Sequence, residues 1–389
     1  MKFLHLSDLH IGKSVHGFSM AAEQKHAFEQ IIGYIKAERP DAVVIAGDIY
    51  DRAVPGVEAV RMFDDFLTEL AAEKAAVMII SGNHDSPERL NYASRLLEEK
   101  RLHICGSFDG SLRKVAINDE YGEVSFWLLP FIKPPQLRGL FGDREIDSYD
   151  DAVAAILDAA DIDFTSRNVI VTHQFYTKSG VTPIRSESET NPVGGLDAVS
   201  AELIERFDYA ALGHLHGAQT VGSDHIRYCG SPIKYSFSEW RQHKSATLVE
   251  MNEKGSLSIT TLPLVPIHEM REIRGEIRNL ISDEVVALAD KNDYLRAVLT
   301  DEEQIIDPMQ RLRSVYPNAM CLDFDNKRTK INLGTITADR GAVATLSIYE
   351  MFSEFFLEVQ GMTMSVEQSD IVRELLEINT QSEQLSLFA

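Results

Sequence analysis

Short, continuous apolar runs alternate with segments of helical periodicity over the first 270 residues of the chain. The runs at 42–46 and 77–80 contain no polar residue, which is typical of strands buried on both faces, and residues 3–7 form a third short strand. Between these runs, residues 21–36 and 57–72 carry apolar side chains at the spacing of an amphipathic helix. This order predicts consecutive β-α-β units.

Further strand-like runs follow. Those at 102–104, 114–117 and 124–129 are predicted to form a second sheet, which runs at 226–229 and 246–251 would complete. Helices predicted at 151–160 and near 200–207 precede apolar runs at 168–172 and 209–212. The polar segment 177–195 is predicted to be a mobile or substrate-facing loop, because structureless connections of that length inside compact domains are usually functional or disordered.

The pattern changes after Pro263 and Pro266, which suggest a domain boundary. Residues 268–330 are predicted to form a small α/β module, with a helix at 276–288, strands at 294–299 and 320–324, and a second helix that begins at Asp307-Pro308. Two amphipathic helices are predicted beyond it, at 347–359 and 365–378. The sequence therefore predicts three parts, 1–267, 268–330 and 331–389.

Composition narrows the class of protein. The chain has 389 residues, of which 44% are hydrophobic, and this is enough for two or three globular domains. Polar residues near the N-terminus argue against a signal peptide, and no apolar run is long enough to cross a bilayer, so a cytoplasmic protein is expected. The three cysteines lack metal-type spacing and receive no role.

The net charge limits how the chain can bind an anionic partner. Because its net charge is −22, the chain is not expected to coat nucleic acid through an excess of Lys and Arg. Divalent cations in a pocket, or a basic partner protein, would have to supply positive charge. Residues 333–389 hold two arginines and nine acidic residues, a net charge of −7. Their Phe-rich helices either pack on the main body or dock into a groove of a partner.

Several apolar runs end in side chains that bind metals. Gly47 turns the chain before Asp48, and Asp8 and His10 are two positions apart, so that they point the same way on an extended chain. Ligands of α/β sheets gather at the carboxyl ends of strands. A single such end is usually an ordinary turn, but here the pattern recurs. The side chains at these ends are Asp8, His10, Asp48, Asn83, His84, His173, His214 and His216.

This mixture of carboxylate, imidazole and amide oxygen suits divalent manganese, iron or zinc. One carboxylate can bridge two ions that lie roughly 3.5 to 4 Å apart, the arrangement used in phosphoryl transfer, and we assign that role to Asp48.

The order Asp-x-His, Gly-Asp, Gly-Asn-His-Asp, His and Gly-His-x-His resembles the calcineurin-like metallophosphoesterase family. The resemblance implies an α/β fold of two facing β-sheets flanked by helices, here followed by a small α/β capping domain and a C-terminal helical tail. It also implies two Mn²⁺ or similar ions per chain. One ion would be held by Asp8, His10, Asp48 and His216, and the other by Asp48, Asn83, His173 and His214.

A closer resemblance rests on Gly12, Gly194-Gly195 and the stretches 207–216 and 230–239, which are similar to the nuclease branch of this family that repairs DNA double-strand breaks. It implies a manganese-dependent exonuclease and endonuclease that acts on DNA ends and hairpins. It further implies a heterotetramer of two nuclease chains and two chains of an SMC-like ABC ATPase of the SbcC type, gripped by the tail helices.

Other residues receive catalytic or substrate roles. His84 would stabilise or protonate the leaving oxygen, with either Asp51 or Asp85 as its orienting partner. Candidate substrate contacts are Arg52, His16 and Lys234, although pairing of Arg52 with a surface carboxylate remains an alternative. Two rival functions are a nucleotide phosphodiesterase or protein phosphatase of the same fold, and a scaffold without activity.

Overall fold

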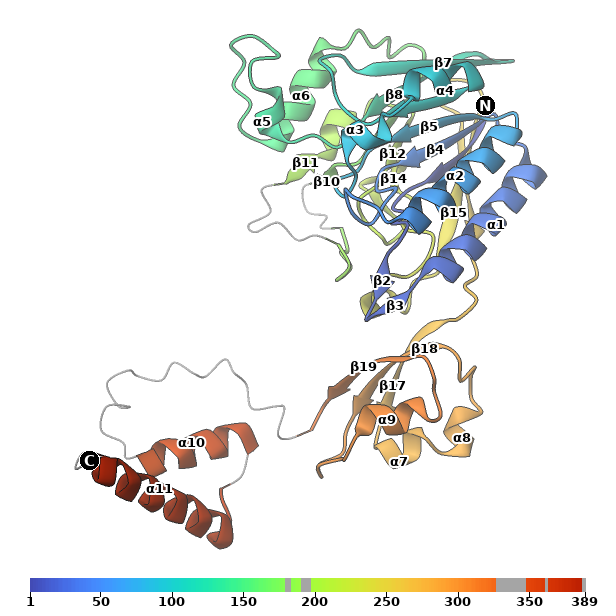
Figure 1. Cartoon of the computed structure of the whole chain (residues 1–389). Helices are drawn as coiled ribbons and strands as arrows, with labels where there is room; N and C mark the ends of the chain where they lie inside the picture. Colours follow the sequence, from blue (N-terminus) through green and yellow to red (C-terminus); the bar gives the residue numbers. More distant parts are fainter. Residues whose placement is uncertain (179–182, 190–196, 327–347, 361–362, 387–389) are drawn as a thin grey trace. The chain divides into compact units, whose positions relative to one another are not determined.

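The computed structural model describes residues 1–178, 183–189, 197–326, 348–360 and 363–386. The chain divides into two compact units, Met1–Arg271 and Glu272–Ala389. In the first unit, two six-stranded sheets face one another, and helices cover their outer faces (Figure 1). The α/β sandwich that the sequence predicts is thereby confirmed.

The first sheet has a parallel centre and an antiparallel edge. Its order is β16 (Leu257–Pro263), β15 (Ser245–Met251), β1 (Lys2–Leu6), β4 (Ala42–Ala46), β5 (Ala76–Ile80) and β6 (Leu102–Cys105). Strands β1, β4, β5 and β6 run parallel, whereas β15 is antiparallel to both β1 and β16. Helices α1 (Ala21–Glu38) and α2 (Val57–Ala72) pack on the outer face, while α3 (Pro87–Leu90) and α4 (Ser94–Leu97) precede β6.

The second sheet has a parallel centre as well. Its order is β13 (Gln219–Val221), β14 (Ser223–Tyr228), β12 (Tyr209–Leu212), β9 (Arg167–Thr172), β8 (Gly122–Leu129) and β7 (Arg113–Asp119). Its outer face packs against α5 (Pro134–Leu137), α6 (Tyr149–Ala159) and the small sheet of β10 (Phe175–Thr177) and β11 (Ala198–Ser200). The expected helix near 200–207 is a single 3₁₀ turn, Ala201–Ile204.

Two strands belong to a different sheet from the one expected. The sequence predicts β6 and β15 in the second sheet, but both lie in the first. Strand β15 pairs with β1 from Lys2↔Glu250 to His5↔Thr247, and β6 pairs with β5. These partners lie far apart in the sequence or follow a crossover, and an apolar run contains no information about which sheet edge accepts it.

The core explains the continuous apolar runs. In β4, Val44 faces the other sheet and Val43 faces α1 and α2, and both are fully buried. The same alternation holds in β9, where Val169 and Val171 face the first sheet and Ile170 faces the outer helices. Because both faces of these strands are covered, apolar residues occupy consecutive positions at their centres.

The second unit contains a three-stranded sheet in the order β17 (Met270–Gly275), β18 (Tyr294–Leu299) and β19 (Ala319–Phe324), with helix α9 (Pro308–Arg313). The helix expected at 276–288 is instead two turns, α7 (Ile277–Leu280) and α8 (Asp283–Val286). Ser282 separates them, because its hydroxyl accepts a hydrogen bond from Val285 N and starts a new helix there.

Two further helices, α10 (Ile348–Gln360) and α11 (Val366–Ser386), form the C-terminal part. Gly194, Gly195 and the basic residues 327–330 lie outside the described residues. Within the described part of the chain, no helix combines the length and hydrophobicity that a membrane span needs.

Candidate metal centre

The predicted ligands come together from five strand ends of the two facing sheets. Asp8 and His10 follow β1, Asp48 follows β4, and Asn83 follows β5. From the second sheet, His173 follows β9, and His214 and His216 follow β12. All are buried except Asn83, which is half-buried. The structure therefore brings all seven residues into one cluster.

One group of potential ligand atoms contains Asp8, His10 and His216, whose atoms lie within 4.8 Å of one another. The Nε2 atoms of His10 and His216 are 3.0 Å apart. Two neutral imidazoles that meet through unprotonated nitrogens repel each other unless a proton or a cation lies between them. This pair is therefore suited to bind a shared cation.

A second group contains Asp8, Asp48 and His173. His173 Nε2 lies 3.2 Å from Asp48 Oδ2 and 3.2 Å from Asn83 Oδ1, and His214 Nδ1 lies 3.0 Å from the same Asn83 oxygen. His10 Nε2 is 3.6 Å from Asp48 Oδ2, so the Asp48 carboxylate contacts both groups. Ligand atoms about 2.1 Å from one ion stand roughly 3.0 to 3.4 Å apart, and the observed spacings fit that geometry.

Electrostatics also favour bound cations. Burial holds the pKa of His10 well below its usual value and lowers the pKa of His214 to about 3, so both rings keep a free lone pair at neutral pH. Among the residues that the structure describes, no hydrogen-bond partner reaches His10 Nδ1 or His214 Nε2, which are both buried. Burial alone would lower the pKa of His173, but the Asp48 and Asp8 carboxylates raise it to about 9. These donors fit divalent metal ions.

The backbone at these strand ends is strained. Asp8, His10, Asp48 and His214 have φ angles of 53°, 42°, 51° and 102°, a region that residues with side chains rarely adopt. Hydrogen bonds from Asp8 N to Gly47 O and from His10 N to Asp48 O join the two loops. The Asp8 carboxylate also accepts a bond from His214 N at 3.0 Å. Strain of this kind gathers at functional sites, where the surrounding structure enforces it.

Three glycines allow the loops to approach closely. A Cβ at Gly82 would lie 2.1 Å from Asp48 Oδ1, and one at Gly213 would lie 1.9 Å from Ala46 O. A Cβ at Gly47 would lie 2.3 Å from His173 Nδ1. Side chains are therefore excluded at these positions because the pocket is assembled from backbone and ligands in direct contact.

A substitution of Gly82→Ala is expected to displace Asp48 and to weaken Mn²⁺ binding. Overpacking of this kind should lower the free energy of unfolding by about 1 to 3 kcal/mol. Chemical denaturation and calorimetric titration of Mn²⁺ measure the two effects. The matched control is Gly33→Ala, which has open space around its Cβ in the middle of α1 and should stabilise slightly. Normal Mn²⁺ affinity in Gly82→Ala would contradict the close packing described here.

Of the two predicted partners of His84, Asp51 is the one in contact with its ring, through the backbone and not the side chain. His84 Nδ1 lies 2.9 Å from the backbone carbonyl oxygen of Asp51, not from a carboxylate. The Asp51 side chain instead accepts a hydrogen bond from Lys13 Nζ at 2.8 Å. The Asp85 carboxylate accepts bonds from three backbone amides, Ile49 N, Tyr50 N and Gly82 N, and so joins the loops after β4 and β5.

The three candidate substrate contacts differ in their surroundings. Arg52 is 71% exposed and lies 3.6 Å from Asp51, so both of its predicted roles remain open. His16 is exposed at the turn between β2 (Ser14–Val15) and β3 (Phe18–Ser19), where positive φ angles at His16 and Gly17 suit a tight hairpin. Lys234 Nζ donates hydrogen bonds to the carbonyl oxygen of Trp240 and to the Glu269 carboxylate. Neither Trp240 nor Glu269 is a predicted metal ligand.

Sequence reasoning missed a set of buried and half-buried polar residues beside His216. Ser188, Glu189, Glu239 and Lys244 all hydrogen-bond to His216 or to one another. Burial alone would raise the pKa of Glu239, but the Lys244 ammonium and His216 hold it below its usual value. Only Glu239 lies within a stretch that carries the family resemblance, 230–239. The other three lie outside that stretch, and Ser188 and Glu189 meet His216 across 28 and 27 positions, so no local pattern marks them.

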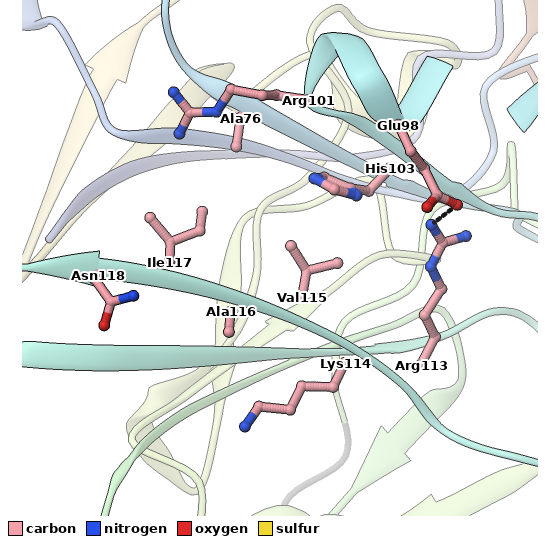
Figure 2. Close-up of a pocket in the computed structure, with 10 residues that line it drawn as sticks. All are labelled: Ala76, Glu98, Arg101, His103, Arg113, Lys114, Val115, Ala116, Ile117 and Asn118. Atoms are coloured by element: carbon pink, nitrogen blue, oxygen red, sulfur yellow. Dashed lines mark hydrogen bonds and ion pairs between the residues drawn. The ribbon is translucent and has the colours of Figure 1, made fainter. Parts of the chain in front are cut away.

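A separate surface pocket of about 460 Å³ lies between the edge strands β6 and β7 (Figure 2). It contains none of the predicted ligands. Its lining is partly basic, but Arg113 pairs with Glu98 at 2.6 Å and Lys114 pairs with Glu123 at 2.7 Å. The candidate chemistry therefore belongs to the buried centre and not to this pocket.

Two facing sheets whose strand ends converge on buried carboxylates and imidazoles define a class of metal-binding hydrolase. Residues 1–218 match the calcineurin-like phosphoesterase family, and the chain belongs to that family. Residues 266–360 match a second family, described as the type 5 capsule protein repressor C-terminal domain.

The chain is also 31% identical over 385 residues to the SbcD subunit of the nuclease SbcCD from Staphylococcus epidermidis, a match that covers 97% of this chain and 98% of that protein. Within its family, this chain is therefore an SbcD-type subunit. Among solved structures, a dimetal phosphatase from Danio rerio is 12% identical with a TM-score of 0.39, and the match covers 68% of this chain and 97% of that one.

Proposed function

We propose that the chain is a metal-dependent nuclease that hydrolyses phosphodiester bonds of DNA. The observation that carries this proposal is the convergence of five strand ends on one buried pocket, in a chain similar over almost its whole length to a nuclease subunit. The proposed metal ligands are Asp8, His10, Asp48, Asn83, His173, His214 and His216. Their oxygen and imidazole donors support Mn²⁺, with two ions per chain.

Charge gives the physical reason for metal dependence. A chain with a net charge of −22 repels a polyanion, and the buried carboxylates of Asp8 and Asp48 add to that repulsion locally. When bound, divalent ions in such a centre lower the pKa of water and offset the charge of the phosphate oxygens. The protein contributes by holding Asp48 in place, through a hydrogen bond of 2.9 Å from His84 N to its Oδ1.

His84 is the proposed general acid. Its ring stands 4.8 Å from that of His10, edge to face, and the side chain is half-buried. Since a carbonyl oxygen can only accept, the contact with Asp51 O requires a proton on Nδ1 and leaves Nε2 to exchange a proton with the leaving oxygen. The Asp51 carbonyl thus takes the orienting role that the sequence predicts for a carboxylate.

The decisive experiment compares two substrates and three metal conditions. The intact chain is incubated with linear or hairpin DNA, and with an aryl phosphodiester, in Mn²⁺, Mg²⁺ or chelator. DNA cleavage that requires Mn²⁺ and disappears with chelator is expected. Hydrolysis of the aryl ester but not of DNA, even with an ATPase partner present, would favour a nucleotide phosphodiesterase or phosphatase. Cation binding without hydrolysis of either substrate would indicate a scaffold.

We also propose a partner, an SMC-like ABC ATPase of the SbcC type, in a heterotetramer with two nuclease chains. The related protein of Staphylococcus epidermidis is itself named as a subunit of SbcCD. Helix α10 exposes Phe352 and Phe355, which are 40% and 58% exposed, and α11 exposes Ile371 and Leu375. Aromatic side chains exposed along short amphipathic helices suit a hydrophobic groove on another protein.

Substitution of Phe355→Glu is expected to weaken capture of the ATPase at least about tenfold, because a charge would have to be buried in an apolar groove. Deletion of 341–389 should abolish capture. Both variants should retain Mn²⁺-dependent hydrolysis of the aryl ester. Gln368→Glu adds the same charge at an exposed position of α11 and should bind normally. Loss of ester hydrolysis together with capture would refute a separate docking role for these helices.

A further inference from the structure

His216 is held by residues from two distant segments. Its Nδ1 lies 2.7 Å from Ser188 Oγ, which lies 2.6 Å from Glu239 Oε1. The backbone of His216 is held as well, since its N–H donates to Glu189 Oε1 at 2.7 Å and its carbonyl accepts from Lys244 Nζ at 2.7 Å. Ser188 belongs to the polar segment that the sequence predicts to be a mobile or substrate-facing loop, and the structure gives this part of the segment a specific contact with His216.

Glu239 and Lys244 form a buried ion pair that holds Ser188. Their side chains are 0% and 6% exposed, and Lys244 Nζ donates to Glu239 Oε2 at 2.6 Å. The ammonium also lies within hydrogen-bonding distance of Ser231 Oγ and Gln242 Oε1, so four oxygen atoms surround it. A buried pair with this many hydrogen bonds keeps Glu239 ionised.

Hydrogen-bond roles then follow from chemistry alone. An ionised Glu239 can only accept, so the single hydroxyl proton of Ser188 points to it. The Ser188 oxygen must in turn accept from His216, which places the imidazole proton on Nδ1. The lone pair of His216 is therefore on Nε2, the atom that lies 3.0 Å from His10 Nε2 in the candidate centre.

We propose that Ser188 and Glu239 are positioning residues that fix the tautomer and orientation of His216 for metal binding. This inference deepens the proposed function and rests on its assignment of His216 as a ligand. Partners of this kind on a metal-binding histidine raise metal affinity by holding the ring in the binding tautomer. Here the Ser188 hydroxyl links the His216 imidazole to the Glu239 carboxylate, and a mainly polar loop supplies that hydroxyl.

The test uses the intact, metal-free chain. Ser188→Ala is expected to lower Mn²⁺ affinity about 10- to 100-fold in calorimetric titration, and Ser188→Thr, which keeps the hydroxyl, should restore it. With ¹⁵N-labelled histidine, NMR should show His216 protonated on Nδ1 in the wild type and in Ser188→Thr. The same spectrum should show a mixture of tautomers in Ser188→Ala.

Ser238→Ala tests whether the loss of any hydrogen bond that holds this loop is enough to lower Mn²⁺ affinity. Ser238 Oγ accepts from Glu187 N at 2.9 Å, so it holds the same segment without touching His216. An equal loss of Mn²⁺ affinity in Ser238→Ala, or an unchanged tautomer in Ser188→Ala, would overturn the proposal. These readouts do not involve DNA. If the wild type cleaves no DNA while the affinities behave as expected, the proposed function fails and the positioning role stands.

Discussion

Replacement of Asp48 by asparagine is expected to reduce metal-dependent cleavage of DNA by at least about a thousandfold. The amide has the same shape and can still accept the hydrogen bond from His84 N, so the loops should keep their positions. What is lost is one negative charge in the pocket, at the carboxylate that contacts both groups of potential ligands. The variant should therefore lose metal binding but still fold.

The measurements for Asp48→Asn are DNA cleavage and calorimetric titration of Mn²⁺. The wild type should bind two ions, and the variant should lose both sites or bind them much more weakly. Mn²⁺ is expected to raise the melting temperature of the wild type but not of the variant, because a bound ion stabilises only the folded state. Asp65→Asn, at an exposed position of α2, removes the same charge and should behave as wild type. Unchanged Mn²⁺ binding in Asp48→Asn would remove this residue from the metal centre.

Substitution of His84→Ala is expected to slow DNA cleavage by roughly 10² to 10⁴, the usual contribution of a general acid. The loss should be much smaller for an aryl phosphodiester, since a phenolate with electron-withdrawing groups leaves without a proton. Affinity for Mn²⁺ should be unchanged. His26→Ala, in α1, is the control, because this histidine lies on a helix that contributes none of the predicted ligands.

The His84 variant also separates two roles that the geometry allows. His84, His10 and Asp48 form a third group whose ligand-type atoms lie within 4.8 Å of one another. If His84 bound metal, His84→Ala would lower Mn²⁺ affinity and slow both substrates to a similar extent. That outcome would exclude the general-acid role, and titration of Mn²⁺ against the variant detects it directly.

Local sequence was sufficient for the strands that end at the candidate centre. Strands β4, β5, β9 and β12 are buried on both faces, so their central positions are apolar, and polar side chains follow where the chain leaves the sheet. Parallel strands bring their carboxyl ends to one edge of a sheet, and the polar residues that follow them meet there. For this reason the residue types and their order predicted a metal-binding centre, and their resemblance to the calcineurin-like family implied the fold before any distance was known.

Other features depended on partners that lie far away in the chain. Strands β6 and β15 have ordinary apolar patterns, and pairing with β5 and β1 decides that they belong to the first sheet. The partner of His84 is a backbone carbonyl, which has no signature in the sequence. Ser188 meets His216 across 28 positions and Glu239 across 51, so no local pattern connects them.

The sequence by itself thus determined which side chains are available, the order in which strands present them, and the class of chemistry they can perform. Tertiary structure decided which sheet each strand joins, which atom orients each imidazole and which buried charges compensate one another. The physical reason is the separation along the sequence between the residues that interact. Burial and periodicity act on neighbours within a few residues, whereas hydrogen bonds and charge pairs act between atoms that only folding brings together.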